Sequence, residues 1–156
     1  MLVQLKVNGR DVAAEITPAM SLASCLRTEL GLTGTKLSCE VGECGSCTVL
    51  LDGKPVTSCL VPAAQTAGRS VETVEGLASD GSLHPLQEAF IKLNAVQCGF
   101  CIPGMIMAAK AALEKNANPT PEEVRFILSG NLCRCTGYQK IVEAVLLAAQ
   151  EMRDHG

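Results

Sequence analysis

The sequence predicts an α+β fold, with a β-rich N-terminal half and an all-helical C-terminal half. Two-residue alternation around Asn-Gly and Asp-Gly turns predicts strands before residue 77, whereas proline and capping signals predict helices after residue 80. Eight of the nine cysteines form two groups, one in each half. A chain of 156 residues can form two small domains, and we expect them at residues 1–77 and 78–156, joined near "EGLASDGSL".

The first half begins with a predicted β-hairpin, because "VQLKV" and "DVAAEI" flank the turn pair Asn8–Gly9. "SLASCLRTEL" follows as a helix, with Leu22, Leu26 and Leu30 at helical spacing. After a cysteine-rich loop, "TVLL" and "KPVTS" flank a second turn at Asp52–Gly53, and "SVETV" adds a closing strand. These elements predict a mixed sheet packed on one helix.

The second half is expected to form four helices with short connections, and hence an antiparallel bundle. The first covers about 84–94, and the second begins at Pro103. The core face of the first helix is predicted to comprise Leu83, Leu86, Phe90 and Leu93.

Two capping boxes are predicted at the starts of the last two helices. Thr120 and Glu123 form one, with Pro121 at the first helical position, and Thr136 and Gln139 in "TGYQ" form the other. The predicted core face of the last helix is Tyr138, Ile141, Val142, Val145 and Met152.

Charge and hydropathy exclude several classes of protein. The net charge of −3 and the lack of a basic patch with interleaved aromatics argue against a nucleic-acid partner. We expect no membrane span and a cytoplasmic protein, because the apolar runs are far shorter than ~20 residues and no secretory signal is recognised. In a reducing compartment, clustered cysteines more often bind metal than form disulfides. With only His84 and His155, a histidine-rich zinc site or a Rieske-type cluster is disfavoured.

The first cysteine group has the spacing C-x4-C-x2-C followed by a distant fourth cysteine. Its members are Cys39, Cys44, Cys47 and Cys59. This is the spacing of plant-type 2Fe–2S ferredoxins, whereas zinc sites favour two close pairs. Gly42 and Gly45 permit positive φ, so that backbone N–H groups can point at the sulfurs. A 2Fe–2S cluster is therefore favoured, with zinc as the alternative and disulfides as the weakest hypothesis.

The second group comprises Cys98 and Cys101 in "CGFC", and Cys133 and Cys135 in "CRC". The two pairs precede the second and fourth predicted helices, which run parallel in an up–down bundle. Both pairs should therefore meet at one end, beside positive helix termini that favour an anionic centre. This arrangement predicts a metal centre without naming the metal, and a redox-active C-x-x-C is the weaker interpretation.

Three motifs, in this order over the whole chain, resemble one family: "CEVGECGSCTVLLDG", "AVQCGFCIPGMIM" and "GNLCRCTGY". The chain resembles the small iron–sulfur subunit of the molybdenum hydroxylases, which include xanthine dehydrogenase, carbon monoxide dehydrogenase, and nicotinate and quinoline dehydrogenases. The resemblance implies an N-terminal β-grasp ferredoxin domain and a C-terminal four-helix domain, each with one 2Fe–2S cluster.

The resemblance also implies partners and an electron path. Electrons would pass from molybdopterin, expected as the cytosine dinucleotide, on a large subunit through the helical-domain cluster and then the ferredoxin-domain cluster. They would reach FAD on a medium subunit, in a dimer of heterotrimers. By motif position, Gln97 and Cys135 match family residues that contact the pterin. Ile102 departs from the pattern, since many members have Thr there.

No Ser/His/Asp constellation or acid–base pair stands out in the sequence, which favours an electron-transfer component of an oxidoreductase without substrate chemistry of its own. Two alternatives are a free-standing soluble two-cluster ferredoxin-like carrier and a zinc-stabilised interaction module. The ninth cysteine, Cys25, lies between Leu22 and Leu26 and is expected to be a buried core thiol.

Overall fold

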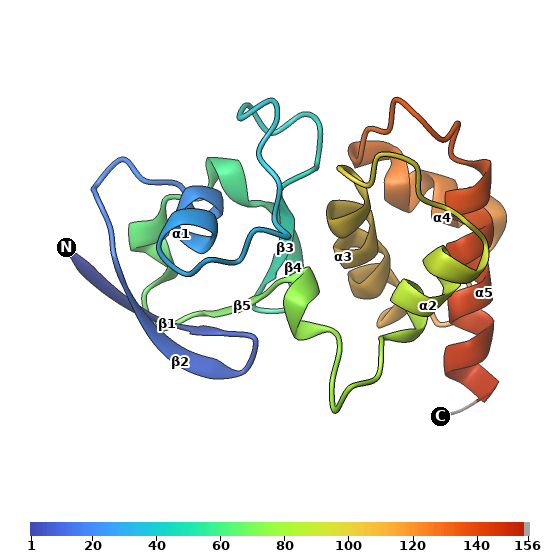
Figure 1. The fold of residues 1–156 in the computed structure, drawn as a ribbon, viewed down its shortest axis with the longest axis horizontal. Coiled ribbons are helices and arrows are strands. Elements are labelled where there is room, and N and C mark those ends of the chain that lie inside the picture. Colours follow the sequence, from blue (N-terminus) through green and yellow to red (C-terminus); the bar gives the residue numbers. More distant parts are fainter. Residues whose placement is uncertain (155–156) are drawn as a thin grey trace.

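The computed structural model describes residues 1–154, in which an N-terminal α/β half lies beside a helical C-terminal half (Figure 1). The N-terminal half contains one mixed sheet with strand order β2-β1-β5-β3-β4. Its strands are β1 (Leu2–Val7), β2 (Arg10–Glu15), β3 (Thr48–Leu51), β4 (Lys54–Thr57) and β5 (Ser70–Glu72). Strands β1 and β5 are parallel, and the other neighbours are antiparallel. The predicted mixed sheet is therefore confirmed.

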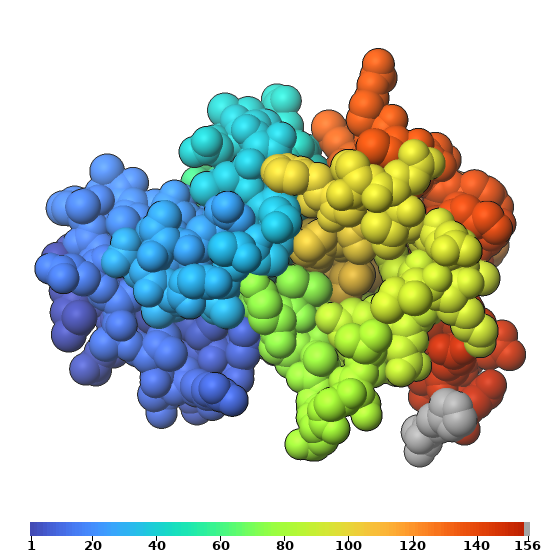
Figure 2. All heavy atoms as spheres, viewed as in Figure 1, coloured from blue at the N-terminus to red at the C-terminus, as the bar shows by residue number. Residues whose placement is uncertain are grey.

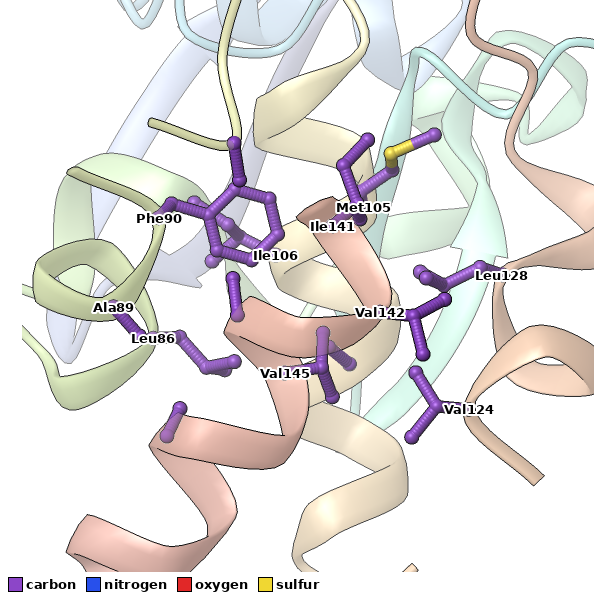
Figure 3. Close-up of a cluster of buried hydrophobic side chains, with 14 of the residues drawn as sticks. Leu86, Ala89, Phe90, Met105, Ile106, Val124, Leu128, Ile141, Val142 and Val145 are labelled. Carbon is purple, nitrogen blue, oxygen red and sulfur yellow. The ribbon is translucent and has the colours of Figure 1, made fainter. Parts of the chain in front are cut away.

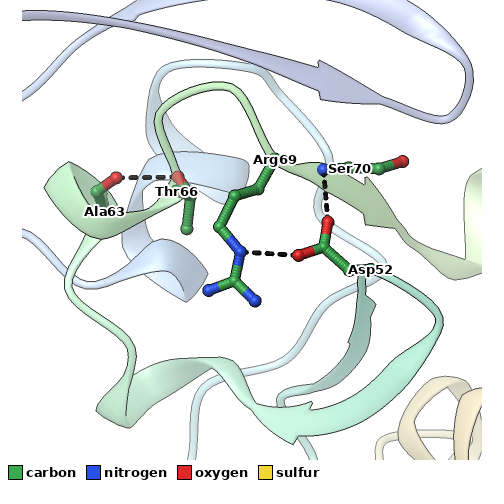
Figure 4. Close-up of polar contacts among 5 residues, drawn as sticks. All are labelled: Asp52, Ala63, Thr66, Arg69 and Ser70. Carbon is green, nitrogen blue, oxygen red and sulfur yellow. Dashed lines mark hydrogen bonds and ion pairs between the residues drawn. The ribbon is translucent and has the colours of Figure 1, made fainter.

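Both predicted hairpin turns are present. Asn8 and Gly9 have φ of 50° and 79°, and Asp52 and Gly53 have φ of 50° and 75°, as the mirror-image turns of tight hairpins require. The Asp52 carboxylate also accepts hydrogen bonds from Arg69 Nε at 2.7 Å and from the Ser70 N–H at 2.9 Å (Figure 4). The tip of the β3–β4 hairpin is thus tied to the start of β5.

Helix α1 (Leu22–Thr28) packs its apolar face on the sheet. Leu22, Cys25 and Leu26 are fully buried, so the prediction of a buried Cys25 is confirmed. The Ser21 hydroxyl caps the helix by accepting a hydrogen bond from the Ser24 N–H at 3.2 Å. The segment after the β3–β4 hairpin forms two short 3-10 helices, η1 (Ser58–Leu60) and η2 (Ala63–Thr66), which lead back to β5.

The helical half contains the four predicted helices around a common core (Figure 3). They are α2 (Pro85–Lys92), α3 (Ile102–Leu113), α4 (Pro121–Ile127) and α5 (Gln139–Asp154). Two further 3-10 helices are η3 (Val74–Gly76) before the connection and η4 (Leu128–Gly130) after α4. The fully buried side chains include Leu86, Phe90, Met105, Ile141 and Val145. None of the helices described is long and apolar enough to cross a membrane.

Two sequence predictions about helix starts are corrected. Thr136 and Gln139 do not form a capping box, because α5 begins only at Gln139 and Tyr138 adopts a left-handed φ of 69°. Leu83 is 44% exposed rather than part of the core face, since it precedes the helix. His84 is the N-cap of α2, where its Nδ1 accepts from the Leu86 N–H at 3.2 Å.

The Thr120–Glu123 capping box of α4 is confirmed by both of its hydrogen bonds. The Glu123 N–H donates to the Thr120 hydroxyl at 3.2 Å, and the Thr120 N–H donates to the Glu123 carboxylate at 2.7 Å. The helix therefore begins where the sequence signal places it.

The two halves share an apolar contact in which α3 packs against β3. Leu50 of β3 and Met107 and Ala111 of α3 are buried together there. Lys110 of α3 forms an ion pair with Glu72 of β5 at 3.0 Å beside this contact. The halves are therefore joined by packing as well as by the connecting chain.

Candidate iron–sulfur centres

The first cysteine loop, between α1 and β3, wraps its backbone around the Cys39 sulfur. The Val41 and Cys44 N–H groups donate to Cys39 Sγ at 3.5 and 3.4 Å. Gly42 and Gly45 have φ of 82° and 70°, so the predicted positive φ and the predicted N–H contacts are both confirmed. These donors lower the pKa of Cys39 to about 6, which favours the thiolate that binds metals.

The β3–β4 hairpin brings the fourth cysteine of this group to the loop. Thr48 pairs with Thr57, so the residues that flank the hairpin, Cys47 and Ser58, are neighbours. The Ser58 hydroxyl donates to the Cys47 carbonyl at 2.6 Å, which places Cys59 beside Cys47. Burial raises the pKa of Cys47 to about 11, with the Cys59 thiol contributing. This thiol would lose its proton on metal binding.

The second group gathers at one end of the helical half, as predicted. Cys98 and Cys101 precede α3, and the sulfurs of Cys98 and Cys135 are 3.5 Å apart. Burial, with the nearby Cys133 thiol contributing, raises the pKa of Cys101 to about 12. Cys133 and Cys135 lie in the segment before α5, at least four positions before its first residue, Gln139. Of the two helices α3 and α5, only α3 begins directly after a cysteine.

Local hydrogen bonds orient Cys133 within this group. Its sulfur lies 3.0 Å from the Thr136 hydroxyl and accepts from the Thr136 N–H at 3.4 Å. Burial opposes ionisation of Cys133, but the Thr136 donors, together with the Cys135 N–H and the Cys101 thiol, outweigh it and lower the pKa of this thiol. Thr136 therefore supports a thiolate rather than the helix cap that its sequence context predicts.

The eight thiols are arranged in pairs. The sulfurs of Cys98 and Cys135 lie 3.5 Å apart, and the pKa values of Cys39, Cys47 and Cys101 are each affected by another thiol of the same group, that of Cys44, Cys59 and Cys133 respectively. A single zinc ion requires four donors around one point, whereas a 2Fe–2S cluster distributes four cysteines over two irons. Two pairs per loop fit the binuclear cluster.

The two loops lie against each other. The Leu132 N–H donates to the Cys44 carbonyl at 2.9 Å, so the residue before Cys133 is bonded to a cysteine of the other group. Figure 2 shows the first loop (cyan) in contact with the segment before α3 (yellow) on one face of the molecule. The sequence alone did not predict this contact, since it joins segments that are remote along the chain.

Exposed apolar residues lie close in the sequence to the exposed pair Cys98 and Cys135, and the exposed Arg134 directly precedes Cys135. Val96, Phe100 and Leu132 are 39%, 43% and 56% exposed. Gln97, which precedes Cys98, is also exposed. Cys98 and Cys135 of the second group are therefore exposed to solvent, while Cys101 is buried.

Two family models match the chain. A 2Fe–2S iron–sulfur cluster binding domain matches residues 5–77, and a second [2Fe–2S] binding domain matches residues 73–146. The nicotine 6-hydroxylase small subunit of Paenarthrobacter nicotinovorans is 57% identical over 92% of this chain and 87% of its own length. The nicotinate dehydrogenase small FeS subunit of Eubacterium barkeri is 47% identical over 95% of this chain and 94% of its own.

Further similarity comes from two other proteins. The xanthine dehydrogenase iron–sulfur-binding subunit of Escherichia coli O157:H7 is 48% identical over 92% of this chain and 91% of its own. The crystal structure of quinoline 2-oxidoreductase from Pseudomonas putida 86 contains a chain that superposes with a TM-score of 0.95. That chain is 47% identical, and the match covers 99% of this chain and 96% of that one.

Fold and paired thiols together define a protein with two 2Fe–2S-binding domains, the first of ferredoxin type and the second four-helical. Within that class, the chain belongs to the small iron–sulfur subunits of the molybdenum hydroxylase family, and it is a component of an oxidoreductase complex.

Proposed function

We propose that this chain carries electrons from a molybdopterin centre on a large partner subunit to FAD on a medium subunit. The helical domain, residues 78–156, would receive them, and the N-terminal domain, residues 1–77, would deliver them; residues 155–156 lie outside the described part. The observation that carries the proposal is the pair of cysteine groups. Two cysteines of the second group are exposed, and a backbone hydrogen bond from Leu132 to Cys44 joins the second group to the first. Bound 2Fe–2S clusters supply reversible one-electron chemistry.

We assign the ligands of the two clusters from the paired thiols. Cys39, Cys44, Cys47 and Cys59 would hold the first cluster. Cys98, Cys101, Cys133 and Cys135 would hold the second. The N–H groups of Val41, Cys44 and Thr136 donate to sulfur in the structure, and such donors adjust the potential of a cluster.

The exposed residues beside Cys98 and Cys135, among them Val96, Phe100 and Leu132, would be covered by the large subunit. A molybdopterin cytosine dinucleotide bound there would be reached by Gln97 and Cys135, the two exposed residues whose motif positions match pterin contacts.

The substrate would bind to the large subunit, because relatives named for nicotine and for aldehyde are 57% and 45% identical to the same small-subunit sequence. A dimer of heterotrimers is the expected assembly.

Iron and sulfide analysis with EPR of the reduced protein tests the proposal. Four irons and four sulfides per chain, with two distinct 2Fe–2S signals, are expected. Fewer irons or a single signal would contradict it, and a colourless protein with stoichiometric zinc would favour the zinc module. Co-purification with molybdenum-containing and flavin-containing subunits distinguishes the complex from a free-standing carrier.

Replacing Gln97 tests the proposed pterin contact. Gln97→Ala should leave both clusters assembled, since no cysteine is changed, but should slow electron transfer from the large subunit. Stopped-flow reduction of the reconstituted complex by substrate measures this rate, with Gln150→Ala at an exposed position of helix α5 as a matched control. Unchanged reduction of the clusters in Gln97→Ala would remove this role.

A further inference from the structure

Asn131 places a buried amide between the two cysteine loops. Its side chain is only 5% exposed, and its Nδ2 donates to the Gly45 carbonyl at 2.9 Å and lies 3.3 Å from the Thr48 hydroxyl. Gly45 lies between Cys44 and Cys47 in the first loop, whereas Asn131 lies two residues before Cys133 in the second. A buried amide destabilises the fold unless it is hydrogen-bonded, and here both bonds cross from one half of the molecule to the other.

The backbone beside Asn131 extends this link to the second cysteine group. The Asn131 carbonyl accepts from the Tyr138 hydroxyl at 3.1 Å, and the same hydroxyl accepts from the Cys133 N–H at 2.7 Å. On the other side, the Leu132 N–H donates to the Cys44 carbonyl at 2.9 Å. Asn131 and Leu132 therefore connect Cys44 of the first group to Cys133 of the second.

Glycines make this approach sterically feasible. Gly45 has a φ of +70°, and a Cβ there would come within 2.7 Å of Asn131 Nδ2 and closer still to the Gly130 carbonyl. Gly104 in the first turn of α3 borders the same contact, since a Cβ there would collide with the Gly45 carbonyl. The first loop is thus enclosed by α3 on one side and by the segment 130–132 on the other.

We propose that the Asn131 side chain is a positioning residue that fixes the separation and orientation of the two cluster loops, and through them the rate of electron transfer between the clusters. The inference rests on the proposed function, in that both cysteine groups hold 2Fe–2S clusters. The Asn131 amide is hydrogen-bonded to the Gly45 carbonyl, so its effect acts through the backbone of the first loop rather than through the metal.

The positions of the cysteines make the rate of electron transfer between the clusters depend on the hydrogen bond from Asn131 to Gly45. Cys44 directly precedes Gly45, and Cys133 directly follows Asn131 and Leu132, which are hydrogen-bonded to the first loop. A shift of one loop against the other therefore changes the distance between the two sets of cysteine ligands. Electron tunnelling falls exponentially with distance, and the dipolar interaction between two paramagnetic clusters falls with the cube of their separation. Both quantities report loop geometry, whereas the melting temperature reports stability alone.

The test compares the cluster-loaded full chain with its Asn131→Ala, Asn131→Ser and Asn131→Asp variants. Ala removes the donor, Ser retains a shorter hydroxyl donor, and Asp keeps the shape but replaces the amide donor with an acceptor facing the Gly45 carbonyl. Asn118→Ala is the matched control, because Asn118 is exposed and lies away from both loops. Iron content, the dipolar splitting in EPR of the fully reduced protein, and the inter-cluster rate after flash reduction are measured for each.

Asn131→Ala should keep four irons per chain but should weaken or broaden the dipolar splitting and slow the inter-cluster rate severalfold. Asn131→Ser should recover part of both, and Asn118→Ala should match the wild type. If Asn131→Ala lowers only the melting temperature, with splitting and rate unchanged, the positioning role is overturned. If Asn131→Ala fails to fold, unchanged splitting and rate in Asn131→Asp, which also lacks the donor to the Gly45 carbonyl, overturn it. Fewer than four irons in the wild type would overturn the proposed function together with this inference.

Discussion

At the scale of single residues, close backbone contact decides which side chain a position can hold. Gly104 occupies the first turn of α3, where Ala would ordinarily be preferred over Gly by about 1 kcal/mol. In this fold, however, a Cβ at Gly104 would also lie 3.2 Å from Asn131 Nδ2 and 3.3 Å from the Ser46 carbonyl, besides colliding with Gly45. The contact between the loops therefore outweighs helix propensity.

Gly104→Ala should lower the free energy of unfolding by roughly 1–3 kcal/mol, the usual cost of forcing extra volume into a packed contact. Denaturant unfolding measures the change. Gly130→Ala is the control in the neighbouring segment, because a Cβ there meets nothing within 4 Å, and it should be close to neutral. A Gly104→Ala protein more stable than the wild type would contradict the contact.

Residue-level prediction from the sequence succeeded where a local pattern carried the information. The cysteine spacing and Gly42 and Gly45 predicted a loop whose N–H groups face sulfur, because both features depend on neighbours a few residues apart. Asn131 and Tyr138 were not predicted as parts of this contact, since their partners, Gly45 and Cys133, are identified only by the folded backbone.

At the scale of elements, capping and turn signals determined where helices and hairpins begin and end. Thr120 and Pro121 predicted the start of α4 because all the groups of a capping box lie within four residues. The same motif at Thr136 was wrong: its hydroxyl contacts Cys133 Sγ and accepts from the Tyr138 N–H at 3.3 Å. A cysteine contact competes with the cap there, and the sequence signal does not include it.

Thr120→Ala should destabilise the protein by about 1 kcal/mol, because the Glu123 N–H loses its acceptor at the start of α4. Thr120→Ser retains a hydroxyl and should lose much less. Thermal unfolding of the two variants side by side measures the difference. Equal melting temperatures for Ala and Ser would show that the cap contributes nothing to stability.

The β3–β4 hairpin gives the protein a stabilising contact that depends on pH. The Ser70 N–H and the Arg69 guanidinium hold the pKa of Asp52 below its ordinary value of 3.8. A carboxyl whose folded pKa is depressed contributes stability above its unfolded pKa and loses it as pH falls through the folded pKa. Acid should therefore weaken the tie between the hairpin tip and β5.

Asp52→Asn should remove this contribution, so that unfolding free energy falls less steeply between about pH 5 and pH 3 in the variant than in the wild type. Asp80→Asn makes the same charge change in the exposed connection between the halves and serves as the control. Denaturant titrations at several pH values measure the slopes. Parallel pH profiles for Asp52→Asn and the wild type would exclude the contribution of this ion pair.

At the scale of the whole molecule, the order of elements could be predicted but their mutual placement could not. Hairpin turns, helix faces and cysteine spacing act locally, and they correctly predicted an α/β half followed by four helices. The packing of Met107 against Leu50, and the ion pair between Lys110 and Glu72, arise only when the two halves meet. The proximity of the two cysteine groups follows from that packing rather than from either motif.

Two halves with separate cores should lose their clusters independently. Cys44→Ser keeps the Cys44 backbone carbonyl, so the hydrogen bond from the Leu132 N–H can persist while the first cluster loses a thiolate ligand. We expect about half of the iron and only the EPR signal of the second cluster in this variant. Cys101→Ser should show the reverse, with the first signal retained.

Cys25→Ala is the matched cysteine control for this pair of variants, because Cys25 of α1 is fully buried in the N-terminal core and lies outside both groups. It should retain all the iron and both signals, at some loss of thermal stability from the removed core volume. Iron analysis and EPR on the three variants, each purified as the full chain, decide the outcome. Loss of both clusters in Cys44→Ser alone would mean that the first loop is required to fold the second, because the loops are bonded to each other between Cys44 and Leu132. If Cys44→Ser and Cys101→Ser each retain one 2Fe–2S EPR signal, each half binds its cluster without the other cluster. The contact between the loops would then serve electron transfer.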